Sequence, residues 1–149
     1  MIGMKLNTAK SMFFDSPKVK NAVDKATRKV LSRFGAFVRR TAKLSIRKRK
    51  KASEPGKPPN SHTGLLKKFI FFGYDPAKRS VVIGPTRLNS TAAFVPPILE
   101  HGGTTKIIKR RRGRRVVVPV QIAARPFMRP AFHKELPKLP DMWRDSVKP

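Results

Sequence analysis

Apolar residues recur at steps of three and four through the first third of the chain, and this pattern predicts a long amphipathic helix. Ser16-Pro17 is typical of a helix start, because it offers an N-cap side chain followed by proline in the first turn. Between Pro17 and about Ile46 the helix would be ~45 Å long, with its Lys and Arg residues mostly outside the apolar stripe. The stripe consists of Val19, Ala22, Val23, Ala26, Val30, Phe34, Phe37, Val38 and Ala42.

A helix of this length with one apolar side has to pack on a sheet or on another subunit. For Phe34, Phe37 and Val38 we favour packing on a sheet of the same chain over a subunit interface. Gly35 either weakens the middle of the helix, by roughly 1 kcal/mol relative to Ala, or permits close packing there.

Apolar and β-branched runs further along the chain predict two β-hairpins. Residues 65–74 and 80–83 are joined by the turn-rich segment 75–79, an arrangement typical of a hairpin. Residues 104–109 and 116–120 flank a tip of five arginines and one glycine, and they predict a second hairpin. Residues 94–99 form either a short helical turn or an irregular segment, because Pro96-Pro97 excludes a central strand.

We predict one α+β domain spanning residues 1–149: a long N-terminal helix packed on a small antiparallel β-sheet, with a short C-terminal helix at about 130–134 and extended loops. Its further parts are an N-terminal segment (1–15), a basic, proline-rich arm (47–63), the arginine-tipped hairpin (104–120) and a C-terminal tail broken by prolines (136–149). We expect the arm to be partly extended and to order against a neighbouring subunit or ring.

The charge balance narrows the classes of partner. The chain carries 35 Lys and Arg against 8 Asp and Glu, a formal net charge of +27. Self-repulsion on this scale opposes a compact fold unless nucleic acid, phosphate or acidic protein neutralises it. No apolar run approaches the ~20 residues of a membrane span, and the first fifteen residues make a poor secretory signal. We therefore expect a protein that acts inside the cell or within an assembled particle, with no membrane partner.

Residues that carry chemistry are sparse. His62, His101 and His133 are far apart in sequence and show no metal-ligand spacing, and the chain contains no Cys. Glu100 and His101 are adjacent, so their side chains point in different directions and a catalytic dyad is disfavoured. The sequence therefore predicts no enzyme, no cofactor and no metal site. A small nuclease or toxin would need a carboxylate or histidine cluster that folding brings together.

Two basic runs are the candidate contact sites for DNA or for acidic neighbours. The aromatic residues lie in apolar runs and are not interleaved with arginine, so they do not predict a base-stacking platform. The alternative for the second run is a solvated hairpin tip. The candidate contact residues are Arg47, Lys48, Arg49, Lys50, Lys51, Lys109, Arg110, Arg111, Arg112, Arg114 and Arg115.

The order of segments resembles the tail-completion, or head–tail connector, proteins of long-tailed bacteriophages. Three short elements follow the long helix in the order found in that family. They are a proline-rich loop leading into Thr63-Gly64-Leu65 and a hairpin that Val82-Ile83-Gly84 closes, then Ile98-Leu99-Glu100-His101-Gly102, and last Ala124-Arg125-Pro126-Phe127 followed by Met128-Arg129-Pro130-Ala131. His101 stands where the family usually has Phe, and the segment 105–120 is longer and more basic than usual.

The resemblance implies a non-enzymatic virion protein at the neck or tail top, made in the host cytoplasm. It would form a ring, often a hexamer, that joins the head connector to the tail and lets double-stranded DNA pass. Its partners would be copies of itself, adaptor or stopper proteins, and tail-terminator or tail-tube proteins. The runner-up is a free-standing basic nucleic-acid-binding protein, either ribosome-associated or DNA-packaging.

The matching elements also give a set of structural motif residues. Within this set we expect Glu100 and Arg125 to form a buried or interfacial ion pair surrounded by Leu99 and Phe127. Pro126 would set the turn through which Phe127 anchors the last helix. The motif residues are Gly64, Leu65, Glu100, Gly102, Arg125, Pro126 and Phe127.

Overall fold

A computed structural model describes residues 16–86, 95–111 and 113–147 of the chain, and the predicted N-terminal segment 1–15 lies outside these residues. The elements, in chain order, are α2 (Ser16–Ser45), α3 (Leu65–Lys68), β1 (Ile70–Asp75), β2 (Ser80–Pro85), α4 (Val95–His101), β3 (Gly103–Arg111), β4 (Arg114–Ile122), α5 (Met128–Glu135), a short 3₁₀ turn (Leu136–Lys138) and α6 (Leu139–Trp143). This arrangement confirms the α+β class and the long N-terminal helix.

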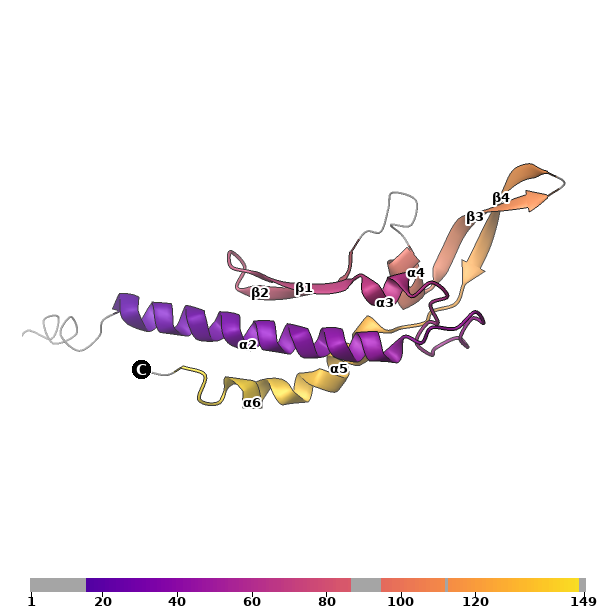
Figure 1. The fold of residues 1–149 in the computed structure, drawn as a ribbon. Helices are drawn as coiled ribbons and strands as arrows, with labels where there is room; N and C mark the ends of the chain where they lie inside the picture. The colour runs from indigo at the N-terminus through magenta and orange to yellow at the C-terminus, as the bar shows by residue number, and fades with distance from the viewer. Residues whose placement is uncertain (1–15, 87–94, 112, 148–149) are drawn as a thin grey trace, which may run out of the picture.

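Helix α2 is the central element, and other elements cover it on two sides. The β1–β2 hairpin lies along one side of α2, and α5 and α6 lie along the other (Figure 1). The first turns of α2 extend past both layers (Figure 1), which is why Val19 and Val23 are half exposed. The apolar stripe is therefore buried only where α2 has covering elements.

The buried part of the stripe follows steps of four residues along α2. All six of its members are at most 4% exposed. Steps of four advance slowly around an α-helix, so the stripe turns about the axis and reaches both covering layers. Phe34, for example, contacts Phe132 of α5 edge to face, with ring centroids 5.7 Å apart. The six residues are Ala26, Val30, Phe34, Val38, Ala42 and Ile46.

The core is small and joins α2 to both layers. Phe34, Phe127 and Ile70 lie at its centre, and Val81, Ile83 and Leu99 pack on it from outside. The expectation of core packing is therefore confirmed for Phe34 and Val38. Phe37 is only half buried, and Arg33 lies over its ring at 5.8 Å.

Gly35 marks a close approach between α2 and the first hairpin. A Cβ atom at Gly35 would lie 2.8 Å from Val81 Cγ2 and 2.9 Å from Phe72 Cδ2. Of the two alternatives that the sequence left open for this glycine, the structure supports close packing.

The first hairpin begins later than the sequence predicted. Residues 65–68 form the short helix α3, and β1 pairs with β2 only from Ile70, which lies opposite Pro85. The helical turn places Leu66 and Ile70 four residues apart, on the same side, and both are buried in the core. Burial of this pair outweighs the strand preference of the surrounding residues.

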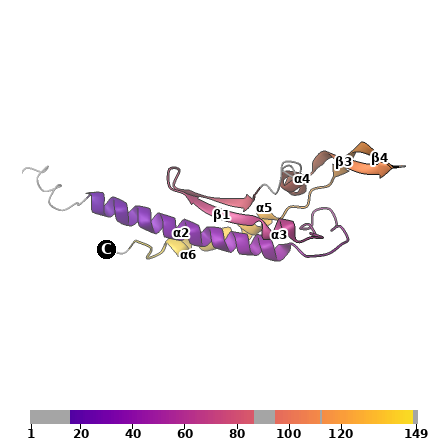
Figure 2. The ribbon, with the colours of Figure 1, turned by 45° about the horizontal axis from the view of Figure 1, so that its top comes forward.

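The second hairpin pairs β3 with β4 and forms a separate two-stranded sheet, so the two hairpins do not share the single small sheet that was predicted. Gly102 and Gly103 have φ of 77° and 142°, and these left-handed conformations turn the chain out of α4 into β3. This second hairpin, which we call the β3–β4 ribbon, projects away from α2 and the first hairpin (Figures 1 and 2). The main contact of the ribbon with another element is between β3 and α4.

Prolines lie at the starts of the short helices and do not break them. Pro96 and Pro97 occupy the first turn of α4, which settles the segment at 94–99 as helical from Val95. Helix α5 begins at Met128, two residues before the predicted start. The predicted proline-broken tail is helical to Trp143, because Pro137 and Pro140 stand at the first or second position of the 3₁₀ turn and of α6.

Candidate functional site

The first basic run, residues 47–51, follows directly after α2. All five of its side chains are exposed. The run belongs to the basic loop, our name for residues 46–61, which lies at the end of the molecule opposite the start of α2 (Figure 1). The chain leaves and returns at the same place, because Ser61 N–H donates to the Arg47 carbonyl at 2.9 Å and Arg47 pairs with Asn60.

Side-chain and backbone hydrogen bonds close the basic loop, which is more compact than the partly extended arm we expected. Asn60 Nδ2 donates to the Lys51 carbonyl at 2.8 Å. Gly56 N–H donates to the Ala124 carbonyl at 2.8 Å, and Arg125 Nε donates to the Ser53 carbonyl at 2.9 Å. Pro59 is fully buried. These contacts satisfy several of the loop's backbone polar groups and fasten it to the segment that connects β4 to α5.

The basic loop surrounds an open hollow of about 590 Å³, which we call the basic hollow. Lys57, which the sequence analysis did not select, lies here with Arg47, Arg49 and Lys51. Its Nζ is 2.6 Å from Glu54 Oε2. The complete lining is Ser45, Arg47, Arg49, Lys51, Ala52, Ser53, Glu54, Lys57, Pro58 and Asn60.

The second basic run lies at the tip of the ribbon, far from the basic loop (Figure 1). The register places Arg110 opposite Arg115 and Arg111 opposite Arg114, while Lys109 faces Val116. Like charges directly opposite each other destabilise a strand pair. The fold therefore keeps the two basic runs apart and concentrates repulsion at the tip; Arg112 lies outside the described residues.

The ribbon has one predominantly apolar face. Residues paired across antiparallel strands point to the same side, so the register assigns five Val and Ile residues to one face, together with Thr105 and, toward the tip, Lys109. Four of them are half buried and Val116 is 40% exposed. On the opposite face, Ile108 and Val117 are 64% and 58% exposed. The apolar face consists of Ile107, Val116, Val118, Val120 and Ile122.

Glu100 holds the start of α5. Its Oε2 accepts hydrogen bonds from the N–H groups of Phe127 at 2.9 Å and Met128 at 3.0 Å, and its Oε1 accepts one from Arg129 at 2.8 Å. These N–H groups have no partner within the helix, and a carboxylate is favoured at a helix N-terminus. Glu100 therefore serves as the cap of α5, although it belongs to α4.

The predicted ion pair between Glu100 and Arg125 does not form within the chain. Arg125 Nε donates to Ser53 and its Nη1 donates to the Ala123 carbonyl at 3.1 Å. Among the ion pairs of the described residues, none joins Arg125 to Glu100. Backbone N–H groups at the start of α5 provide the neutralising partners that we had assigned to the guanidinium.

Three motif residues, Gly102, Arg125 and Phe127, nevertheless lie around this junction. Arg125 N–H donates to the Leu99 carbonyl at 2.6 Å, and Phe127 is 1% exposed in the core. At Gly102 a Cβ would lie 3.0 Å from Ala124 N, so the motif requires glycine there for space and for φ. Two further motif residues lie elsewhere. Gly64 precedes α3 with φ of 77°, and Leu65 is 45% exposed while its neighbour Leu66 is buried.

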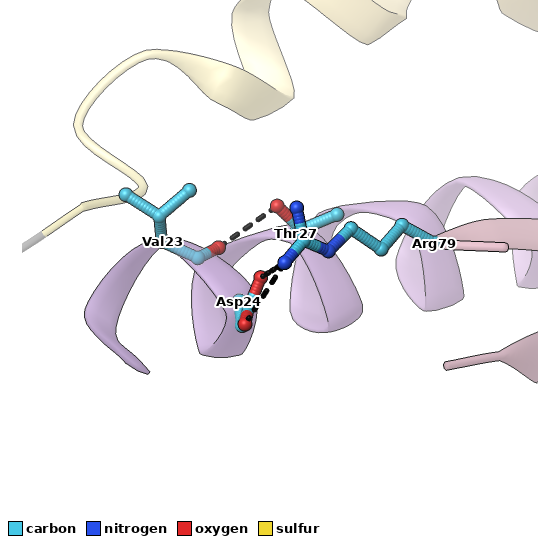
Figure 3. Close-up of polar contacts among 4 residues, drawn as sticks. All are labelled: Val23, Asp24, Thr27 and Arg79. Carbon is cyan, nitrogen blue, oxygen red and sulfur yellow. Dashed lines mark hydrogen bonds and ion pairs between the residues drawn. The ribbon is translucent and has the colours of Figure 1, made fainter. Parts of the chain in front are cut away.

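The turn of the first hairpin is attached to α2 through Arg79. Arg79 Nη2 lies 3.2 Å from Asp24 Oδ1 and 3.4 Å from Oδ2 (Figure 3). One helical turn further on, Thr27 Oγ1 donates to the Val23 carbonyl at 2.8 Å (Figure 3). Because both charged side chains are largely exposed, this ion pair orients the turn more than it stabilises the fold.

Two ionisable groups have shifted pKa values. Hydrogen bonds from Lys138 and Thr41 hold the pKa of the buried Glu135 carboxyl below its ordinary value, against the opposing effect of burial. Partial burial lowers the pKa of Lys43, and the charges of Arg39 and Lys67 lower it further. Lys43 lies at the end of α2 among other cations, and its Nζ is 5.9 Å from the centre of the Phe71 ring.

Metal-ligating side chains are not gathered in the described parts of the chain. Within residues 16–86, 95–111 and 113–147, no group of three or more His, Asp or Glu side chains is close enough to bind a metal ion. His62, His101 and His133 are all exposed. In the same ranges no helix is both long enough and apolar enough to cross a membrane.

Comparison with models of known protein families, with characterised proteins and with solved structures gives no significant match for this chain.

Proposed function

We propose that this chain is a structural subunit of a bacteriophage neck or tail top, and that its copies form a ring that joins the head connector to the tail and lets DNA pass. The ordered motifs of the sequence support this proposal. The structure adds one observation that carries it further, which is the β3–β4 ribbon with its apolar face.

An isolated two-stranded ribbon is at most marginally stable in water. On the apolar face of this ribbon Val116 is 40% exposed and the other four side chains are half buried, and no full layer of the described residues covers them. A neighbouring copy that packs on the ribbon would bury these side chains. Contacts of this head-to-tail kind close into a ring when the rotation between copies permits it.

The direct test locates the protein in purified virions. Mass spectrometry of virions and a reconstruction of the neck are expected to place several copies around the DNA channel. In solution, the mass measured at moderate salt without nucleic acid should exceed that of a monomer. A chain that is absent from virions and monomeric at all concentrations would overturn the proposal.

The two faces of the ribbon offer a matched pair of variants. We expect Val118→Asp, on the apolar face, to abolish oligomers, and Val117→Asp, on the opposite face, to preserve them. Circular dichroism of both variants checks that the body remains folded. Equal behaviour of the two variants would show that the apolar face is not the subunit contact.

The runner-up is a free-standing basic nucleic-acid-binding protein, and the basic hollow is the observation that favours it. This alternative predicts a monomer with strongly salt-dependent binding to nucleic acid. The same mass measurement, made with and without nucleic acid, separates the two functions.

A further inference from the structure

We infer that the basic hollow is a binding site for the phosphate groups of a nucleic-acid backbone. Its lining brings together four cations, Arg47, Arg49, Lys51 and Lys57, and one carboxylate, Glu54, which leaves three positive charges in excess. Glu54 pairs with Lys57. Of the ion pairs among the described residues, none engages the other three cations. An anion entering the hollow would therefore meet three cations without having to break an existing ion pair.

Ser53 adds a donor to this lining. Its Oγ is buried and has no hydrogen-bond partner in the described parts of the chain. A buried hydroxyl without a partner has lost the hydrogen bonds that it made to water in the unfolded chain, so such groups are rare in folded proteins. Turned toward the hollow by rotation about its Cα–Cβ bond, the Ser53 hydroxyl would donate this hydrogen bond to a phosphate oxygen.

Side-chain and backbone hydrogen bonds hold the shape of the hollow. Hydrogen bonds at Asn60, Gly56 and Arg125 fix the loop at three points before any ligand arrives. Binding to a fixed loop loses less conformational entropy than binding to a disordered basic run. This distinguishes the basic loop from the ribbon tip, where the register sets arginines opposite each other and like charges repel.

The size and composition of the hollow favour a backbone segment over a lone ion or a base. At about 590 Å³ it lies within the range of pockets that hold small organic ligands, and far above the ~30 Å³ of one water molecule. The described lining contains no aromatic side chain on which a base would stack. Contacts to phosphate and sugar alone carry no sequence information, so binding should not depend on base sequence.

This inference goes beyond the proposed function and does not require a ring. Salt-dependent binding of the full chain to a short fluorescent DNA duplex tests it, with anisotropy measured between about 50 and 200 mM salt. The test variant is Arg49→Gln with Lys51→Gln. The control is Lys20→Gln with Lys29→Gln, which removes the same charge from exposed positions on α2.

Each cation that neutralises a phosphate contributes ~0.9 to the slope of log affinity against log salt. We expect the slope to fall by about 1.8 in the hollow variant and to be unchanged in the control. Ser53→Ala should weaken binding by about tenfold, as for one hydrogen bond to a charged group. Its melting temperature should be equal to or higher than that of the wild type, because the unpaired hydroxyl is gone.

Three results would overturn the inference. Equal slopes in the two double variants would show that binding follows overall charge. Tighter binding of inorganic tripolyphosphate than of the duplex would assign the hollow to free phosphates. If the chain bound poly-glutamate, and if only the hollow variant lost this binding, the hollow would be assigned to an acidic protein. Oligomer mass is measured on the same samples, so failure of the phosphate site remains distinct from failure of ring assembly.

Discussion

Thr41 Oγ1 donates a 2.6 Å hydrogen bond to Oε1 of Glu135, which joins the C-terminal part of α2 to the end of α5. The carboxylate is only 4% exposed, and Lys138 Nζ lies 2.7 Å from its other oxygen. Two donors therefore satisfy a charge that would otherwise be costly to bury. The C-terminal layer is fastened to α2 by this contact as well as by apolar packing.

Glu135→Gln is expected to destabilise the fold at neutral pH by about 1–3 kcal/mol, because it weakens two hydrogen bonds to a buried charge. Since the pKa of Glu135 is lowered in the folded state, its contribution is present above ~pH 4.3 and is lost as the pH falls through the folded pKa. Urea denaturation at pH 7 and at pH 3 measures the difference. Glu54→Gln, at an exposed site, serves as the control, and an equal loss at both pH values would contradict the assignment.

Gly35→Leu should lower the free energy of unfolding by about 1–3 kcal/mol, because the added atoms overlap Val81 and Phe72 where α2 meets the first hairpin. Ala36→Leu is the matched control, since Ala36 is the next residue on α2 and is exposed. Denaturant titration of both variants compares them. If the two variants were equally stable, the close approach at Gly35 would have no energetic weight.

Glu100→Gln replaces one carboxylate oxygen by an NH₂ group, which cannot accept the N–H groups at the start of α5. The expected loss is about 1–3 kcal/mol of unfolding free energy, measured by thermal or denaturant unfolding. Asp141→Asn removes an exposed, ion-paired carboxylate and should change stability by less than about 0.5 kcal/mol. A Glu100 variant as stable as wild type would show that solvent can cap α5 equally well.

Arg110→Glu should stabilise the β3–β4 ribbon by roughly 0.2–1 kcal/mol, because it places opposite charges where two arginines now face each other. Amide hydrogen exchange of β4 reports this locally, and protection should increase. Arg110→Gln, which removes repulsion without adding attraction, should give a smaller gain. The difference should shrink at high salt, where exposed charges are screened; unchanged protection in both variants would count against the register.

Local patterns predicted most of the elements but few of their boundaries. The four-residue spacing of Val30, Phe34 and Val38 is sufficient to identify α2 and its buried side, because side-chain direction along a helix depends only on position in the chain. The same reasoning failed at residues 65–68, where burial of Leu66 decided the structure. Strand or helix propensity describes one segment at a time and does not include the free energy that the segment gains by burial in the core.

The candidate sites divide in the same way. The density of cations at 47–51 and at the ribbon tip is visible in the sequence. Lys57 and Ser53 were missed, because only the folded loop brings them beside the first basic run. A lysine six residues beyond that run and a lone serine carry no signal by themselves.

For this protein, the sequence alone determined the long helix, the two hairpins and the cationic character, since these depend on periodicity, turn residues and composition. Tertiary structure alone decided that the hairpins form separate sheets and that Glu100 caps α5 and does not pair with Arg125. It also closed the basic loop around a hollow. Such outcomes depend on which distant groups compete for the same hydrogen bond or the same buried space, and that competition exists only once the chain has folded.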